Sequence, residues 1–306
     1  MKFLFNMYNH NVTGQRSLED VIGIFGHQLR ALGHTAIWEE DNKNFYVGPD
    51  IVNVVVEGFT KGHENIIGEA KARGARFMML ATEEPTDKGF NHGTQLEMVH
   101  RQRDFPAVAQ HFEGILHLVP GEAVTKWYSQ FAPSAYLELG YAPSLVRKHN
   151  VEPDYDFGFY GSLTSRRLKI LKKLANKINT PKAVKIVADF KTQQERDAQM
   201  SRARVILQVR KFDEMGLVSS SRCNTSLSIG RPVVAEPHLL SKPWDEVVMF
   251  SSSPDDFYSR AILVRSMWRG IHADQFGKFK EKFTPEFCVG EPLRRIGILE
   301  EKSIAA

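Results

Sequence analysis

SIGRPVVAE, residues 228–236, contains the end of an amphipathic helix, a glycine turn and a short apolar strand that finishes on a carboxylate. Gly230 is the residue type that commonly ends a helix in a left-handed turn. Pro232 to Ala235 form an uninterrupted apolar run, which is typical of a strand buried on both faces of a parallel sheet. Glu236 at the tip of this strand has no obvious packing role. Its position predicts that the carboxylate interacts with a group that lies outside the sheet.

The same alternation of short apolar runs and longer amphipathic runs extends along the chain. In the first half it predicts strands at 2–8, 35–39, 51–56, 76–81 and 114–119, with helices at 17–32, 64–73 and 95–112. In the second half it predicts strands at 157–160, 183–188, 205–209, 232–235 and 247–250, with helices at 165–178, 193–202, 220–229 and 256–268. This alternation favours right-handed crossovers and parallel sheets with helices on both faces.

Segment 141–156 interrupts this rhythm with two prolines and scattered charges, as linkers between domains often do. We therefore expect an α/β protein of two Rossmann-like doubly wound domains, residues 1–145 and 146–283, which face each other across a cleft. In open parallel sheets, ligands bind beyond the carboxyl ends of the strands. The loops that follow the predicted strands are therefore the candidate sites.

Composition and charge narrow the class of protein. Hydrophobic residues make up 42% of the 306 residues and charged residues 25%, which are ordinary globular values. The net charge of +4 suits anionic ligands but is too small to indicate nucleic acid by itself. Two cysteines are too few for a disulfide framework, and no apolar run reaches the length of a membrane span. These features predict a cytoplasmic protein with no membrane span.

The first candidate anion site is the strand–helix junction in FYGSLTSRRLKI, residues 159–170. Gly161 and Ser162 follow the strand, and Arg166 and Arg167 stand in the first turn of the helix. A helix N-terminus attracts anions and disfavours cations, so a bound phosphate would explain the two arginines. The alternative is a solvated basic face, which the lysines of helix 165–178 would continue. No Walker-type phosphate loop is present.

The second candidate is the junction in VRKFDEMGLVSSSRCNTS, residues 209–226. Arg210 follows the strand, and Ser220, Ser221, Arg222 and Asn224 open the next helix. Several hydroxyl groups and free backbone N–H groups at a helix start suit a diphosphate. Helix capping alone is the alternative, and it would need only one of the serines.

These junctions together resemble the nucleotide-binding half of the GT-B-type glycosyltransferases. The resemblance lies in G-S-L after the first strand of the second domain, the basic helix start, and G-x-P-V-V before Glu236, and it is strongest over 157–252. It implies that the second domain holds a nucleotide-diphosphate sugar and that the first domain holds the acceptor. It also implies that a tail, residues 284–306, crosses back to the first domain.

The resemblance implies roles for individual residues around the donor. Those expected to bind it are Gly161, Ser162, Arg166, Arg167, Arg210, Glu214, Ser220, Ser221, Arg222, Asn224 and Glu236. Glu214 matches the first acid of the E-x7-E motif of retaining enzymes, but Arg222 occupies the position of the second acid. Glu236 is then expected to hold the ribose hydroxyls, as acids at strand tips do in dinucleotide sites. The alternative role for Glu236 is to cap a helix or loop.

Glycosyl transfer needs positive charge near the departing diphosphate and, in an inverting reaction, a general base for the acceptor hydroxyl. The arginines can supply that charge, so we expect no essential metal ion and no other cofactor. The predicted catalytic residues are His10, Asp20 and Glu84, with Glu19, His27 and Glu83 as further candidates. Gly14, Gln15, Arg16 and His92 are predicted to line the acceptor site. Each histidine has an ordinary surface or core role as its alternative.

The sequence therefore predicts a metal-independent glycosyltransferase that moves a sugar from a nucleotide-diphosphate donor, such as a UDP-sugar, to an acceptor hydroxyl. One alternative is a sugar-nucleotide epimerase of similar architecture. Another is a protein that binds or decorates DNA, which the basic helix 165–178 allows. The acceptor (a saccharide, a small molecule or a polymer) and the choice between inversion and retention are not fixed by the sequence.

Overall fold

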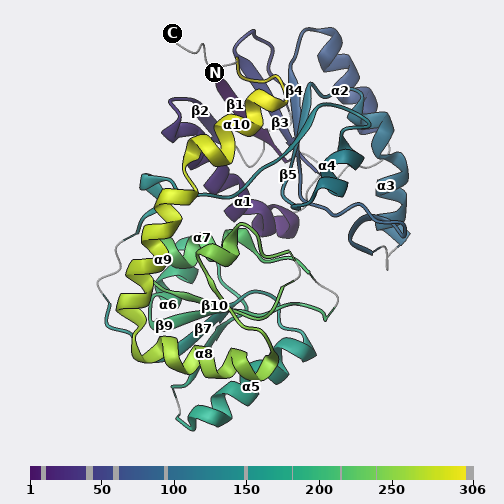
Figure 1. Cartoon of the computed structure of the whole chain (residues 1–306). Helices are drawn as coiled ribbons and strands as arrows, with labels where there is room; N and C mark the ends of the chain where they lie inside the picture. The colour runs from purple at the N-terminus through teal and green to yellow at the C-terminus, as the bar shows by residue number, and fades with distance from the viewer. Residues whose placement is uncertain are drawn as a thin grey trace. The chain divides into compact units, whose positions relative to one another are not determined.

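The computed structural model in Figure 1 divides into two compact units. It describes residues 1–7, 12–38, 44–57, 62–92, 96–147, 151–180, 182–213, 216–238 and 240–300; for 12–17 and 92 it describes the backbone alone. The first unit comprises Met1–Gly140 and the segment that begins at Thr284, and the second comprises Tyr141–Phe283. The boundary thus lies five residues before the predicted one.

The first unit is built on a six-stranded parallel sheet in the order β2-β1-β3-β4-β5-β6. Its strands are β1 (Lys2–Asn6), β2 (Thr35–Trp38), β3 (Ile51–Val56), β4 (Phe77–Ala81), β5 (Gly114–His117) and β6 (Ser134–Tyr136). Its helices are α1 (Val12–Ala31), α2 (His63–Ala72), η1 (Phe90–His92), α3 (Leu96–Ala109), α4 (Glu122–Tyr128), η4 (Glu286–Gly290) and α10 (Glu291–Arg295).

The strands of this sheet are apolar because both of its faces are covered. Every residue of β4 is buried, and so is every residue of β3 after Ile51. The chain runs from β1 out to β2 and then returns past β1 to β3. This reversal makes the carboxyl ends of β1 and β3 the switch point of the sheet, where open α/β sheets bind ligands.

The second unit has a five-stranded parallel sheet in the order β11-β10-β9-β7-β8. Its strands are β7 (Tyr155–Tyr160), β8 (Val184–Val187), β9 (Ala203–Gln208), β10 (Val233–Ala235) and β11 (Met249–Phe250). Its helices are η2 (Pro143–Leu145), α5 (Ser165–Ile178), α6 (Gln193–Met200), α7 (Ser220–Ser228), η3 (Trp244–Glu246), α8 (Pro254–Ser266) and α9 (Trp268–Lys282). Its switch point lies between β7 and β9.

Close packing fixes β7 between β9 and β8 in this sheet. Phe157 and Phe159 are fully buried in one core cluster with residues of α5 and α8. On the other face, a Cβ atom added to Gly158 would come within 2.9 Å of the side chains of Ala203 and Ile206. The glycine therefore leaves room for these side chains of the neighbouring strand β9 beside β7.

The C-terminal segment packs within the first unit. The side chain of Ile296, just after α10, lies so close to β5 that a Cβ atom on Gly114 would meet it at 2.7 Å. Helix α10 also contacts β6. The sequence predicts that the tail from residue 284 crosses back to the first domain, and in the structure the segment from Thr284 is part of that unit.

The predicted α/β class with two parallel, doubly wound sheets is confirmed. One boundary is wrong in a way that matters for the site. Helix α1 begins at Val12 rather than at residue 17, so Gly14, Gln15 and Arg16 are helical and do not belong to a polar loop. Elements α4, β6 and α9 have no counterpart in the prediction. No helix in the described part of the chain is long and apolar enough to span a membrane.

Candidate functional site

Arginine side chains gather around one buried glutamate at the carboxyl edge of the second sheet. Arg166 and Arg167 come from the first turn of α5, Arg210 follows β9, and Arg222 belongs to the first turn of α7. Glu236 directly follows β10. We call these five residues the arginine cluster. It lies at the β7/β9 switch point, where the topology of the sheet predicts a ligand site.

Glu236 fixes two members of this cluster. Its Oε1 atom accepts a hydrogen bond from Nη2 of Arg166 at 2.8 Å, and its Oε2 atom accepts one from Nη1 at 2.9 Å. Oε2 also accepts the backbone N–H of Arg210 at 2.7 Å. Glu236 is only 1% exposed, so this bidentate salt bridge lies in an environment of low dielectric constant. The pair raises the pKa of Arg166.

Arg166 and the backbone of Arg210 are thus the hydrogen-bond partners of Glu236 at the strand tip. Glu236 orients Arg166 and, through its hydrogen bond with the backbone of Arg210, stabilises the loop after β9. Its predicted role with ribose hydroxyls stays a prediction. Arg166 has a second carboxylate partner, Asp213, but that side chain is 76% exposed. The buried pair therefore dominates the position of Arg166.

Arg167 and Arg222 are also buried, at 5% and 8% exposure. Arg167 donates to the carbonyl oxygens of Val209 at 3.0 Å and Ser162 at 2.9 Å. Burial, and then the charge of Arg222, lower the pKa of Arg167 to about 10, so it remains a cation at neutral pH. Arg222 donates to the side-chain oxygen of Gln208. Both guanidinium groups lie over the ring of Phe159, at 5.2 and 5.4 Å from its centroid.

The described residues of the cluster thus carry four guanidinium groups around one buried carboxylate. Buried charges are costly unless charges of the opposite sign accompany them. Asp213, the second carboxylate that pairs with Arg166, is exposed and compensates little of this buried charge. A dianionic or trianionic ligand would offset the excess charge, and the planar donors of arginine match the oxygens of a phosphate.

Gly161 lies next to the guanidinium groups of Arg222 and Arg167. It has φ of +123°, which a residue with a side chain rarely adopts. A Cβ atom there would lie 3.0 Å from Nη2 of Arg222 and 3.9 Å from Nη1 of Arg167. The backbone at the end of β7 therefore lies directly beside the two guanidinium groups.

The residues predicted at the start of α7 have other contacts. The hydroxyl of Ser220 accepts from the indole of Trp244 at 3.1 Å, and the hydroxyl of Ser221 lies 3.3 Å from that of Ser219. Asn224 is buried, and its side-chain oxygen accepts from Ser228 at 3.2 Å. Ser220 and Asn224 therefore contribute to the packing of α7. Glu214 lies outside the described residues.

Two residues of this edge were not predicted. Gln208, the last residue of β9, positions Arg222. His238 follows Glu236 closely in sequence, and its Nδ1 lies 2.6 Å from the carbonyl oxygen of Glu236. Its Nε2 atom is buried and has no hydrogen-bond partner. Burial lowers the pKa of His238 to about 4, so the ring is neutral at pH 7. The short run E-P-H after an apolar strand was the available signal.

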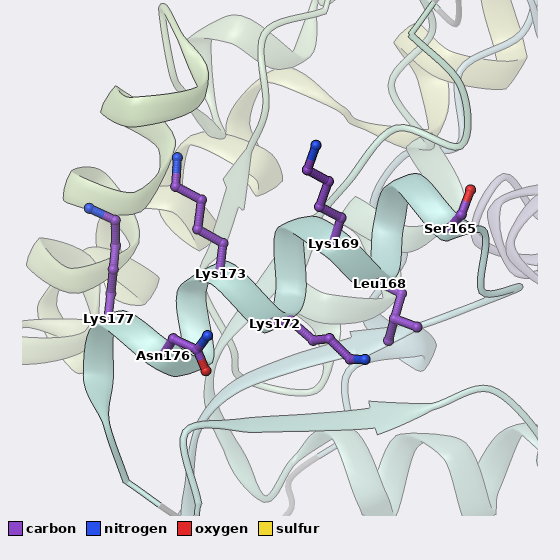
Figure 2. A pocket seen from close by; sticks show the side chains of 7 residues that line it. All are labelled: Ser165, Leu168, Lys169, Lys172, Lys173, Asn176 and Lys177. Atoms are coloured by element: carbon purple, nitrogen blue, oxygen red, sulfur yellow. The ribbon is translucent and has the colours of Figure 1, made fainter.

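A separate basic surface covers the outside of α5, and Figure 2 shows its side chains. A hollow of about 680 Å³ is lined by Ser165, Leu168, Lys169, Lys172, Lys173, Asn176 and Lys177. The ammonium groups of Lys173 and Lys177 lie 4.9 and 5.5 Å from the ring centroid of Tyr258. We call the four lysines the lysine face. It is open to solvent, in contrast to the buried arginine cluster.

The residues predicted to be catalytic in the first unit do not form a described site. His10 lies outside the described residues, and the side chains of Gly14, Gln15, Arg16 and His92 are not described. Asp20 is half-buried within α1. The backbone N–H of Glu84 donates to Asn91 at 3.0 Å. These assignments stay predictions.

Two acids, of which Glu83 was a predicted candidate, are buried at the carboxyl edge of the first sheet. Glu57 directly follows β3, and Glu83 stands two residues after β4; they are 8% and 6% exposed. Burial, and then the charge of Glu83, raise the pKa of Glu57 to about 8. Burial also raises the pKa of Glu83, although Arg101 opposes that shift. Glu57 was missed, although it ends the strand I-V-N-V-V-V-E in the same way as Glu236 ends P-V-V-A-E.

The described residues offer no evident metal centre. Among them, no group of three or more His, Cys, Asp or Glu side chains is placed to hold an ion. One Asp-x-Asp sequence, Asp154 to Asp156, lies at the start of β7, and both acids pair with arginines. That is the opposite edge from the arginine cluster. The expectation of metal-independent chemistry stays a prediction.

Comparisons with known proteins agree with this geometry. No family model matches the chain. An uncharacterized protein of Acanthamoeba polyphaga mimivirus is 32% identical over 79 residues, which are 26% of this chain and 26% of that protein. The β-glucosyltransferase of phage T4 matches over 97% of this chain and 100% of its own, with a TM-score of 0.56 and 11% identity. The chain has the fold of the GT-B glycosyltransferases.

Other enzymes with this fold match as well. AviGT4, a glycosyltransferase of avilamycin A biosynthesis, matches with a TM-score of 0.53 at 10% identity over 97% of each chain. An α,α-trehalose-phosphate synthase of Burkholderia xenovorans matches with a TM-score of 0.50 at 10% identity, over 94% of this chain and 79% of its own. At such identities the likeness establishes the GT-B fold alone. The site must therefore be argued from its own residues.

Proposed function

We propose that this protein is a glycosyltransferase that moves a sugar from a nucleotide-diphosphate donor to an acceptor hydroxyl. The observation that carries the proposal is the arginine cluster, which concentrates buried positive charge at the switch point of a sheet in a GT-B fold. Two phosphate groups carry the negative charge that this site would offset. Cys223 and Cys288 are buried and are not joined in a disulfide, which further supports a reducing compartment, the cytoplasm, for the enzyme.

The proposed role of the cluster is to stabilise the leaving group. When the bond between the anomeric carbon and the phosphate oxygen breaks, negative charge develops on the diphosphate. Arg167 and Arg222, fixed by backbone and side-chain contacts, face the space beside Gly161 where that charge would form. Donors already in place are more effective than donors that must reorganise. This charge supports transfer without an essential metal ion.

We propose UDP as the nucleotide of the donor. The support comes from proteins with the same fold: one structure of β-glucosyltransferase is described with uridine diphosphoglucose as its substrate, and the trehalose-phosphate synthase is described as UDP-forming. The sequence resemblance over 157–252 points to the same half of the molecule for the nucleotide.

A thermal-shift comparison of UDP, GDP, dTDP and ADP, each with and without EDTA, tests this function. We expect UDP to raise the melting temperature by several degrees at 100 times its Kd, since ligand binding at that ratio adds about 2.7 kcal/mol. EDTA should leave the shift unchanged. If none of the four nucleotides stabilises the protein, the proposal is wrong. NMR of UDP-glucose incubated alone separates a transferase from an epimerase, because only the epimerase would produce UDP joined to a different sugar.

DNA is a second candidate partner, as the acceptor of the sugar. The β-glucosyltransferase with the same fold is described as a DNA modifying enzyme. The lysine face supports a polyanionic acceptor, since Lys169 and Lys172 are exposed on a helix whose sequence contains no acid. Contacts of lysines with phosphates would make binding fall steeply with salt.

We expect a mobility shift of duplex DNA that weakens between 50 and 200 mM salt. The double variant Lys169→Glu/Lys172→Glu should lower the slope of log K against log salt by about 2, because each phosphate contact contributes about 1. Lys278→Glu, on α9, is the matched control, since Lys278 already pairs with Asp274. Equal slopes for both variants and the wild type would rule out the lysine face as the contact surface.

A further inference from the structure

The carboxyl edge of β3 and β4 in the first unit contains a second polar site that the arginine cluster does not explain. Strands β3 and β4 are neighbours in the sheet, so Glu57 and Glu83, which follow them, lie close together at its edge. Strand β3 also borders the switch point with β1, and Asn6, the last residue of β1, is buried there. Ligands of α/β sheets bind at such points.

Hydrogen bonding distinguishes the two acids. The side-chain oxygens of Glu57 accept hydrogen bonds from the backbone N–H and the hydroxyl of Thr82. The Oε1 atom of Glu83 pairs with Nη1 of Arg101 at 2.7 Å. The side chain of Glu83 is only 8% exposed, and its Oε2 atom accepts no hydrogen bond. A buried carboxylate oxygen without a donor is costly, so it marks a place where a donor from a ligand would bind.

Burial and the neighbouring charge of Glu83 keep Glu57 protonated at neutral pH. Arg101 and Glu97 of α3, Tyr128 of α4 and the two glutamates are the titratable groups that act on one another here. Tyr128 stays protonated, since burial raises its pKa, and its hydroxyl donates to the backbone oxygen of Glu83 at 2.8 Å. One arginine balances one carboxylate. With its pKa near 8, Glu57 keeps the proton at pH 7, and the carboxylate of Glu83 pairs with Arg101.

We propose that the Oε2 atom of Glu83 accepts the proton of the acceptor hydroxyl, which makes Glu83 the general base and Glu57 a positioning residue. This inference rests on the proposed function. The O–H bond of the acceptor breaks and its proton passes to Oε2. The acceptor oxygen forms a bond to the anomeric carbon of the donor. The bond from that carbon to the phosphate oxygen breaks, and the diphosphate leaves with the electron pair.

Slow transfer to water provides a test that needs no known acceptor. UDP release from UDP-glucose should fall by about 100-fold or more in Glu83→Gln, because general bases contribute 10²–10⁴-fold. The UDP-induced rise in melting temperature should be unchanged in this variant. Glu69→Gln, an exposed acid on α2, is the matched control and should release UDP at the wild-type rate.

Different outcomes separate this inference from the proposed function. If UDP stabilises both proteins and Glu83→Gln releases UDP as fast as the wild type, Glu83 is not the base. A wild type that binds UDP but releases none from UDP-glucose also contradicts the assignment, because a base in this position should activate water. Failure of every nucleotide to stabilise the wild type would instead overturn the proposed function, and the base assignment with it.

The role of Glu57 has an independent readout. In protein labelled with ¹³C at the glutamate carboxyls, NMR should show one carboxyl that titrates near pH 8. This titration should disappear in Glu57→Gln, and so should the change near pH 8 in the pH profile of UDP release, because the amide cannot ionise. If no carboxyl titrates above pH 6, the pair does not share a proton and Glu57 is not a positioning residue of this kind.

Discussion

Arg166→Met is expected to lower the free energy of unfolding of the second unit by about 3–5 kcal/mol, because it leaves Glu236 as a buried charge without its cation. The carboxylate is 1% exposed and would keep only the backbone N–H of Arg210. Urea denaturation monitored by circular dichroism measures the loss. The double variant Arg166→Met/Glu236→Leu should recover part of it, since replacing both charges removes the uncompensated one.

Asp213→Asn supplies the control for this prediction, because it removes the other carboxylate that contacts the same arginine. Asp213 is 76% exposed, and exposed ion pairs contribute about 0–1 kcal/mol. We therefore expect a loss below about 1 kcal/mol. Equal losses in Arg166→Met and Asp213→Asn would show that burial does not set the strength of the pair, and the charge accounting of the cluster would be wrong.

Arg222→Ala is expected to weaken UDP binding by about 30–1000-fold, which corresponds to about 2–4 kcal/mol. Charge-assisted hydrogen bonds to a phosphate are stronger than neutral ones, and removing a single donor to an oxyanion costs about 10²–10³-fold in enzymes. Arg222→Lys keeps the charge and loses the planar fork, so its affinity should lie between those of the wild type and the alanine variant. Isothermal titration calorimetry measures all three.

Arg269→Ala is the matched control for Arg222, because Arg269 is 65% exposed and pairs with the exposed Glu152. Its affinity for UDP should equal that of the wild type. The thermal unfolding of Arg222→Ala without ligand must also be recorded, since Arg222 packs against Phe159 and Tyr160. A folded Arg222→Ala protein with wild-type affinity would remove Arg222 from the phosphate site.

Local signals made much of the fold predictable. The bounds of α5 agree with the prediction because both ends are capped within the sequence: Thr164 accepts from the N–H of Arg167, and Asn179 adopts the left-handed conformation that ends a helix. Helix α9 was missed because its stability depends on tertiary contacts. Gln275 exchanges two hydrogen bonds with the backbone of Val233 on β10, a contact that no local pattern indicates.

The site was predictable in part, and for a physical reason. Glu236 was recognisable as an acid at the tip of a buried strand, but its partner Arg166 lies 70 residues earlier in the chain. The order of the strands in the sheet determines which strand ends are neighbours, and local sequence patterns do not indicate that order. The same signal was present at Glu57 and was overlooked. The early start of α1 at Val12 was hidden because its first turns, V-T-G-Q-R-S, are mostly polar and contain a glycine.

The central claim is that the arginine cluster holds a diphosphate, and calorimetric affinities of UDP and uridine at low and physiological salt test it most directly. We predict that UDP binds at one site per chain and at least about 100-fold more tightly than uridine, because the diphosphate carries most of the contacts. The difference should shrink as salt rises. Equal affinities of UDP and uridine, or no binding of UDP, would contradict the claim.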